Sequence, residues 1–252
     1  MAGDTVEDGV DHDDQAVGRV LTRREAISVL GAGGVLLWLG GTAPAESPVV
    51  GEGITACVVR PELTEGPYFV DERLQRSDIR GDPSDGTVKD GALLALTFNV
   101  ARAGARCTPL AGAIVDLWHC DALGVYSDVQ DRGFDTTGQK FLRGYQVTDA
   151  DGVARFTTIF PGWYQGRTVH LHFKVRSPLS ATRRWEFTSQ LFFTDSLTDT
   201  VHAQQPYAAK GQRSLRNSGD GINRDGGAQL VLDVHPTPAG FGATFDIALD
   251  GV

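Results

Sequence analysis

From residue 92 to the C terminus, short runs rich in β-branched and aromatic residues alternate with clusters of turn-forming residues. The runs cover residues 92–100, 113–120, 144–148, 154–159, 168–175, 187–193, 228–234 and 243–249. This spacing, without heptads or an internal repeat, is typical of a β-sandwich. We therefore predict an all-β fold, a sandwich of mainly antiparallel strands with long loops and little helix, in a single domain over residues 46–252.

Two local signals refine this prediction. Asp151-Gly152 is a dipeptide favoured in tight turns, and it predicts a hairpin between the runs 144–148 and 154–159. Helix-forming patterns are scarce, and the best short candidate lies at residues 199–210.

The first 45 residues have a different character from the rest of the chain. Residues 1–17 are acidic and nearly free of large apolar side chains, as in a disordered leader. Arg23 and Arg24 then precede an apolar run over 26–39 and a small A-P-A sequence, which is the order of a twin-arginine export signal. The run is short for a membrane span. We expect residues 1–45 to be a leader plus signal peptide, and the remainder to be exported to the cell envelope or medium without further membrane association.

Charge and cysteine content narrow the partners and the compartment. The chain has a formal net charge of −9, and no basic patch points to nucleic acid. Three cysteines, Cys57, Cys107 and Cys120, are most simply arranged as one bridge and one free thiol in an oxidising compartment. Three pairings are possible. Cys57 with Cys107 is favoured because Cys120 lies among candidate site residues.

The segment 162–175, GWYQGRTVHLHFKV, carries two histidines one residue apart. In an extended chain His170 and His172 project from one face, while the alternate apolar residues project from the other. Two imidazoles at this spacing can bind one metal ion. Tyr164 lies six residues before His170, and Tyr126 follows the run 113–120 at a glycine-bearing turn. These four side chains can therefore meet at one end of the sandwich.

The residue types favour iron over other metals. A free phenol has a pKa of about 10, so tyrosine becomes a strong ligand only when a highly charged cation such as Fe(III) removes its proton. Zinc is disfavoured because the chain has neither HExxH nor CxxC, and a blue-copper site because the single methionine is Met1. Taken singly, both tyrosines are more often packing aromatics, and Arg167 a solvated turn charge. We interpret His119, beside Trp118, as a structural histidine, whereas Tyr68 either lines the pocket or packs.

The chain resembles the intradiol ring-cleavage dioxygenases, especially their secreted protocatechuate/catechol dioxygenase-like branch. Five segments carry the resemblance in the same order: TEGPYF, VDLWHCDALGVYSD, FLRGYQVTDADGVARFTTIFPGWY, RTVHLHF and FTSQLFF. The resemblance implies one Fe(III) per chain, bound by four ligands: Tyr126, Tyr164, His170 and His172. It further implies that Tyr164 leaves the iron when substrate binds, that Arg167 is the active-site arginine, and that Gln190 lies beside the substrate.

The resemblance also implies an activity. Such an enzyme would cleave catechol, protocatechuate or hydroxyquinol with O2 to cis,cis-muconate-type products that contain both oxygen atoms. Arg60, Arg73 and Arg143 are candidates for binding a substrate carboxylate. The helical segment through which catechol dioxygenases dimerise has no counterpart before TEGPYF, so we do not expect that dimer. The alternatives are a secreted β-sandwich binding module without metal, or an iron-binding protein without turnover.

Overall fold

The computed structural model describes residues 57–178 and 180–252. The leader and signal peptide predicted for residues 1–45 lie outside these ranges. Within the described part of the chain, no helix is both long enough and apolar enough to cross a membrane.

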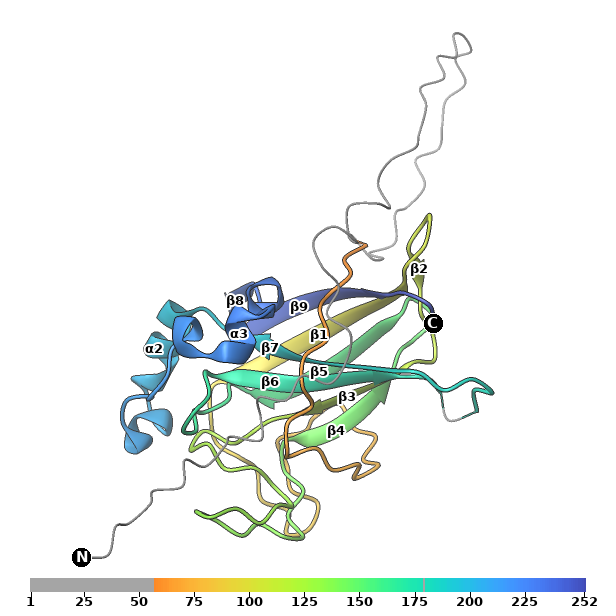
Figure 1. Ribbon diagram of the computed structural model, residues 1–252. Helices are drawn as coiled ribbons and strands as arrows, with labels where there is room; N and C mark the ends of the chain where they lie inside the picture. The colour runs from red at the N-terminus through yellow and green to blue at the C-terminus, as the bar shows by residue number, and fades with distance from the viewer. Residues whose placement is uncertain (1–56, 179) are drawn as a thin grey trace, which may run out of the picture.

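Two stacked β-sheets form the body of the molecule (Figure 1). The first sheet has the order β2 (Thr108–Pro109), β1 (Leu93–Arg102), β9 (Gly240–Leu249) and β8 (Val234–Thr237), with β5 (Val153–Ile159) also paired to β1. The second has the order β4 (Arg143–Val147), β3 (Ile114–Trp118), β6 (His170–Arg176) and β7 (Glu186–Phe192). All pairs between named strands are antiparallel except β1 with β9, which is parallel. The predicted β-sandwich is confirmed.

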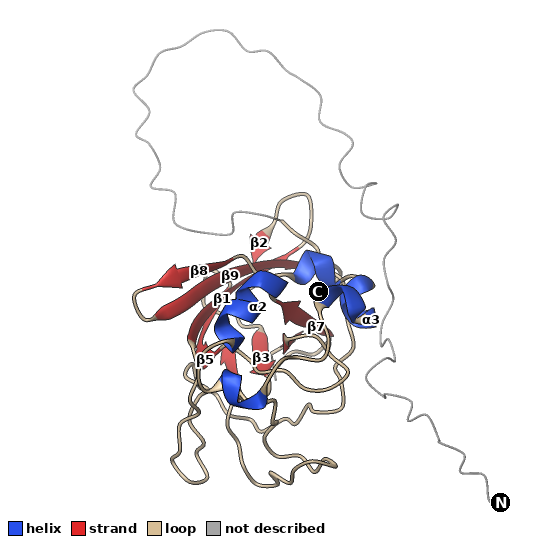
Figure 2. Cartoon of the chain, turned by 90° about the vertical axis from the view of Figure 1, so that its left-hand side faces the viewer, coloured by secondary structure: helices blue, strands red, loops and turns tan. Residues whose placement is uncertain are grey.

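Short helices gather at one end of the sandwich (Figures 1 and 2). They are α2 (Asp195–His202), η2 (Tyr207–Lys210), η3 (Asn217–Gly219), α3 (Gly221–Arg224) and η4 (Gly227–Leu230), of which the η elements are 3₁₀ helices. The helix predicted over 199–210 corresponds to the end of α2 and all of η2. Thr194 begins α2 by accepting a hydrogen bond from the Leu197 amide.

The strand predicted over 228–234 is wrong. This stretch instead contains most of η4, and β8 begins only at Val234. Leu230 is fully buried, and the Leu232 amide donates to the carbonyl of Phe192 at 2.9 Å. The apolar residues here therefore reflect a 3₁₀ turn packed against β7, a burial pattern that a short apolar run cannot distinguish from a strand.

The hairpin predicted at Asp151-Gly152 is also wrong, although the turn itself is present. Gly152 has φ +75°, and the Asp149 amide donates to Val153 at 3.0 Å. However, β4 pairs with β3 while β5 pairs with β1. The Val100 amide donates to Gly152 O at 2.8 Å, which anchors the turn to β1. The turn therefore passes the chain from one sheet to the other.

Aromatic side chains join the two sheets at the centre of the core. The inward positions of β1 alternate with its outward ones, and Phe98 is fully buried. Its ring centroid lies 5.3 Å from that of Phe173 on β6, and Phe173 in turn lies 5.4 Å from Phe245 on β9. Contacts of this kind, between rings from opposite sheets, fix the distance between the two layers.

The favoured cysteine pairing is confirmed. Cys57 and Cys107 form a disulfide, and the free Cys120 is buried. The bridge ties the segment that leads into the domain to the turn between β1 and β2.

We expect Phe98→Ala to lower the free energy of unfolding by about 3–5 kcal/mol, because it leaves a cavity between the sheets. Urea denaturation measures this change. Val88→Ala, at a side chain that is 59% exposed, is the control and should change stability by less than about 0.5 kcal/mol. Equal effects of the two changes would show that Phe98 is not central to the core.

Candidate active site

The strand register of the second sheet places four side chains in one row. Arg143 on β4 lies opposite Trp118 on β3, Trp118 opposite His172 on β6, and His172 opposite Gln190 on β7. Residues directly opposite one another share a face of the sheet. All four are buried, so this part of the outer face is not open to solvent.

The two histidines converge on one point. Their Nε2 atoms lie 2.9 Å apart, and the Tyr164 hydroxyl lies 3.2 Å from His170 Nε2. His170 Nδ1 lies 2.7 Å from the carbonyl oxygen of Thr168, which can only accept, so Nδ1 carries the proton and the Nε2 lone pair faces the cluster. Trp118 stacks on the His172 ring at a centroid distance of 5.1 Å.

Burial keeps both imidazoles neutral. Desolvation lowers the pKa of His170 well below its usual value, and the positive charge of Arg167 adds to this effect. Desolvation acts in the same way on the pKa of His172, followed by the influence of His170. Neutral imidazole is the form that binds metals, so both rings are ready to act as ligands at neutral pH.

Three tyrosines complete the cluster. The ring of Tyr126 lies 5.8 Å from Tyr164 and 6.3 Å from His172, measured between centroids. Tyr68 stacks on Tyr126 at 4.4 Å and meets Tyr164 edge-on at 6.1 Å. Its hydroxyl donates to Asp131 at 2.5 Å. Tyr68 therefore contacts both predicted tyrosine ligands, as expected of a residue that lines the site.

The loops that carry Tyr126 and Tyr164 are packed backbone against backbone. The Gly162 amide donates to Asp121 O at 3.0 Å, and a Cβ atom on Gly162 would lie only 2.4 Å from the carbonyl oxygen of Ala122. A side chain at residue 162 would push the two loops apart. The positions of the two tyrosines consequently depend on each other.

Arg167 takes part in a buried ion pair, unlike a solvated turn charge. Its Nε donates to Asp220 Oδ2 at 2.9 Å and its NH2 group to Gln190 Oε1 at 2.6 Å. Gln190 Nε2 donates in turn to Thr64 O at 3.0 Å. Asp220 was missed by the sequence analysis because it lies 53 residues after Arg167, and its only local signature is that of a helix N-cap.

The other candidates lie outside the cluster or are bound by structural hydrogen bonds. Both ring nitrogens of His119 are hydrogen-bonded, to Cys120 O at 2.8 Å and to Thr158 Oγ1 at 2.6 Å, which agrees with its structural interpretation. Arg143 donates to the main chain of Ser127 and Tyr68. Arg60 donates to main-chain carbonyls of Asp246 and Gln229, and Arg73 is exposed.

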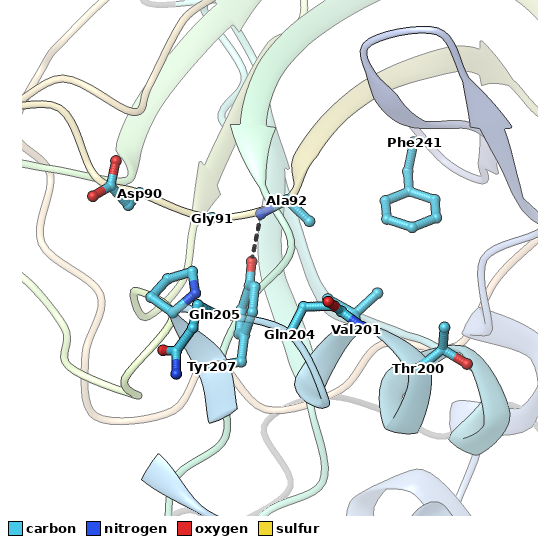
Figure 3. Close-up of a pocket in the computed structure, with 10 residues that line it drawn as sticks. Asp90, Gly91, Ala92, Thr200, Val201, Gln204, Gln205, Tyr207 and Phe241 are labelled. Carbon is cyan, nitrogen blue, oxygen red and sulfur yellow. Dashed lines mark hydrogen bonds between the residues drawn. The ribbon is translucent and has the colours of Figure 1, made fainter. Parts of the chain in front are cut away.

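A cavity of about 540 Å³ lies elsewhere, between the start of β1 and the α2–η2 turn (Figure 3). Its lining includes Asp90, Gln204, Tyr207 and Phe241 but none of the six predicted site residues. The Tyr207 hydroxyl accepts from the Ala92 amide at 3.0 Å and donates to Phe160 O at 2.6 Å. This cavity is therefore distinct from the histidine and tyrosine cluster.

The donor set of the cluster fits a ferric ion. Among the described residues, no group of three or more His, Cys, Asp or Glu side chains is placed to hold a metal. The histidine pair therefore needs the tyrosines to complete a coordination sphere. The two Nε2 atoms are only 2.9 Å apart, so both rings could bind the same metal ion. Phenolate oxygens add hard, negatively charged ligands that suit Fe(III).

Comparison with known proteins agrees with this geometry. A family model described as "Dioxygenase" matches residues 64–251. An intradiol ring-cleavage dioxygenase from Tetranychus urticae has the same fold, with a TM-score of 0.68 and 29% identity, over 78% of this chain and 96% of that chain. The chain belongs to the intradiol ring-cleavage dioxygenase family.

Other members of this family are similar over shorter segments or less closely. Catechol 1,2-dioxygenase 1 of Acinetobacter lwoffii is 29% identical over 143 residues, which are 46% of this chain and 42% of the relative. The dioxygenase domain of a carbohydrate-binding fusion from Streptomyces sp. SirexAA-E has a TM-score of 0.54 and 28% identity, over 77% of this chain and all of that chain. The chain thus spans less than half the length of the first curated relative it matches.

We expect the metal-free protein to lose stability as the pH falls from about 6.5 to 4, in part through His119. Burial lowers the pKa of this residue in the folded protein to about 4. The neutral side chain therefore contributes stability above the pKa of the unfolded state, and this contribution is lost as the pH falls through the pKa of the folded state. The difference between the pKa values of the unfolded and folded states corresponds to about 3 kcal/mol of unfolding free energy.

Urea unfolding at pH 7, 6 and 5 tests the role of His119. His119→Gln should show a shallower decline than wild type, whereas His235→Gln, at an exposed position on β8, should follow wild type. The same slope in all three proteins would contradict the assignment.

Proposed function

We propose that this protein is an Fe(III)-dependent intradiol dioxygenase that cleaves catechol-type diols with O2 to cis,cis-muconate-type products. One observation carries the proposal. His170 Nε2 lies 2.9 Å from His172 Nε2 and 3.2 Å from the Tyr164 hydroxyl. The buried ring of Tyr126 lies beside this group. Two neutral imidazoles and two phenols meet in this cluster. They form a suitable donor set for one ferric ion per chain.

When bound, Fe(III) supplies a Lewis acid that draws electron density from a catecholate and makes its ring reactive toward dioxygen. Tyr126 is fully buried, whereas Tyr164 is half-buried. This difference supports Tyr126 as the ligand that stays and Tyr164 as the ligand that leaves. If Tyr164 were released from the iron, its phenolate would be able to accept the proton of a substrate hydroxyl.

In this proposal Arg167 acts on the substrate, and Gln190, which accepts a hydrogen bond from Arg167, lies beside the substrate. The guanidinium group is buried and already oriented by its contacts with Asp220 and Gln190. A fixed, buried positive charge would stabilise negative charge that develops on the ring oxygen during the reaction, and would do so more strongly than a charge in solvent.

The substrate we favour is a catechol without a carboxylate. Curated relatives include catechol and chlorocatechol 1,2-dioxygenases. Arg60 and Arg143 direct their donors to main-chain oxygens, so neither is offered to a charged ring substituent. We also propose export by the twin-arginine route. The Cys57–Cys107 disulfide supports it because such bonds persist in oxidising compartments.

Iron-loaded protein should be red to brown through charge transfer between phenolate and Fe(III). Tyr126→Phe should bind iron less tightly, whereas Tyr164→Phe should keep more iron but bind catechol more slowly. Iron analysis and visible spectra measure both effects, with Tyr145→Phe on β4 as the control. A folded wild-type protein that stays colourless after iron loading would refute the metal site.

The products distinguish the proposed reaction from its alternatives. Catechol incubated with ¹⁸O2 should give colourless cis,cis-muconate that carries two labelled oxygen atoms, as measured by mass spectrometry. A yellow semialdehyde would contradict intradiol cleavage. Iron binding without oxygen consumption would identify a non-catalytic iron protein, and a protein that binds no iron would favour a binding module.

A further inference from the structure

Asp220 is a buried carboxylate that accepts hydrogen bonds from three directions. Its Oδ2 atom accepts from Arg167 Nε at 2.9 Å and from the Thr168 amide at 2.8 Å. Its Oδ1 atom accepts from the Asn223 amide at 3.0 Å, which begins α3. One side chain thus connects the short helix α3 to the two residues that lead toward β6.

The ion pair between Asp220 and Arg167 is almost completely removed from water, with side-chain exposures of 1% and 2%. A buried charge is tolerated only when it is paired and hydrogen-bonded. Asp220 binds the guanidinium at Nε while Gln190 binds it at NH2. Two contacts at different nitrogens of a planar group define its orientation as well as its position.

Asp220 also reaches the histidine pair through Thr168. The Thr168 amide donates to Asp220, and the Thr168 hydroxyl donates to Asn217 Oδ1 at 2.6 Å. The carbonyl of the same residue accepts the hydrogen bond from His170 Nδ1. The carboxylate therefore supports the backbone that sets the tautomer and ring orientation of His170.

We propose that Asp220 is a positioning residue of the active site, which holds the Arg167 guanidinium in its working orientation and steadies the Thr168 backbone behind His170. The inference rests on the proposed function, because the role of Arg167 toward a catechol substrate belongs to it. Asp220 itself does not touch the substrate or the metal. It acts through Arg167 and Thr168.

A double-mutant cycle tests this role in the iron-loaded protein with catechol. Asp220→Asn should lower kcat/KM by about 10–100-fold, mainly through kcat, because the charge that Arg167 stabilises develops during the reaction. Asparagine removes the negative charge that is paired with the guanidinium but keeps an acceptor for the Thr168 amide, so iron content and the phenolate absorption band should stay as in wild type. The double variant with Arg167→Met should be no less active than Arg167→Met alone, because residues that act as one unit are not additive.

Two further variants separate positioning from general stability. Asp220→Ala removes the acceptor of the Thr168 amide, so it should also weaken iron retention. Asp116→Asn breaks a partly buried pair, in which Asp116 binds Arg176 at the far end of β6, and its kcat/KM should stay within about twofold of wild type. Thermal melting of each variant confirms that it is folded.

The inference is overturned if an active wild type is matched by Asp220→Asn, if the losses from Asp220→Asn and Arg167→Met multiply, or if Asp116→Asn loses as much activity as Asp220→Asn. It is also overturned if Asp220→Asn loses its iron. A wild type that binds iron but consumes no oxygen with any catechol refutes the proposed function instead.

Discussion

The antiparallel register of β3, β6 and β7 is the constraint on which the site depends. It sets Trp118, His172 and Gln190 side by side on the outer face of the second sheet. Because opposite residues in an antiparallel sheet always share a face, a slip of one residue would send His172 into the core and Phe173 to the site. The packing of Phe173 between Phe98 and Phe245 opposes such a slip. The apolar core therefore specifies the geometry of the polar site.

Burial of the part of the outer face that carries the histidines explains the electrostatic character of the cluster. Loops cover the histidines completely, so desolvation holds both imidazoles in the neutral form. The same burial makes the charge of Arg167 costly unless Asp220 compensates it. Neutral imidazoles lie on one side of the cluster and a fixed, paired guanidinium on the other. Charges in such a buried place are screened less than charges in solvent.

The two expectations that failed did so for the same physical reason. Asp151-Gly152 forms the predicted turn, but the flanking strands pair with β3 and β1 in different sheets. The run at 228–234 buries Leu230 and Leu232, yet most of the 3₁₀ helix η4 lies there, against β7, in place of the predicted strand. Local sequence determines that a turn or a buried segment occurs. It does not determine which strand or segment the element pairs with or packs against, because that choice is set by contacts between residues far apart in the chain.

The sequence by itself determined the all-β architecture, through its short alternating runs, and the placement of His170 and His172 on one strand face, through the period of two. Tyr126 and Tyr164 entered through their places next to predicted strand ends and through the family resemblance. Only the tertiary structure decided that this face is buried, that Tyr68 lies against both tyrosines, and that Asp220 compensates Arg167. Strand periodicity is a property of neighbouring residues, whereas burial and ion pairing depend on segments tens of residues apart that meet only when the sheets stack and the loops close over them.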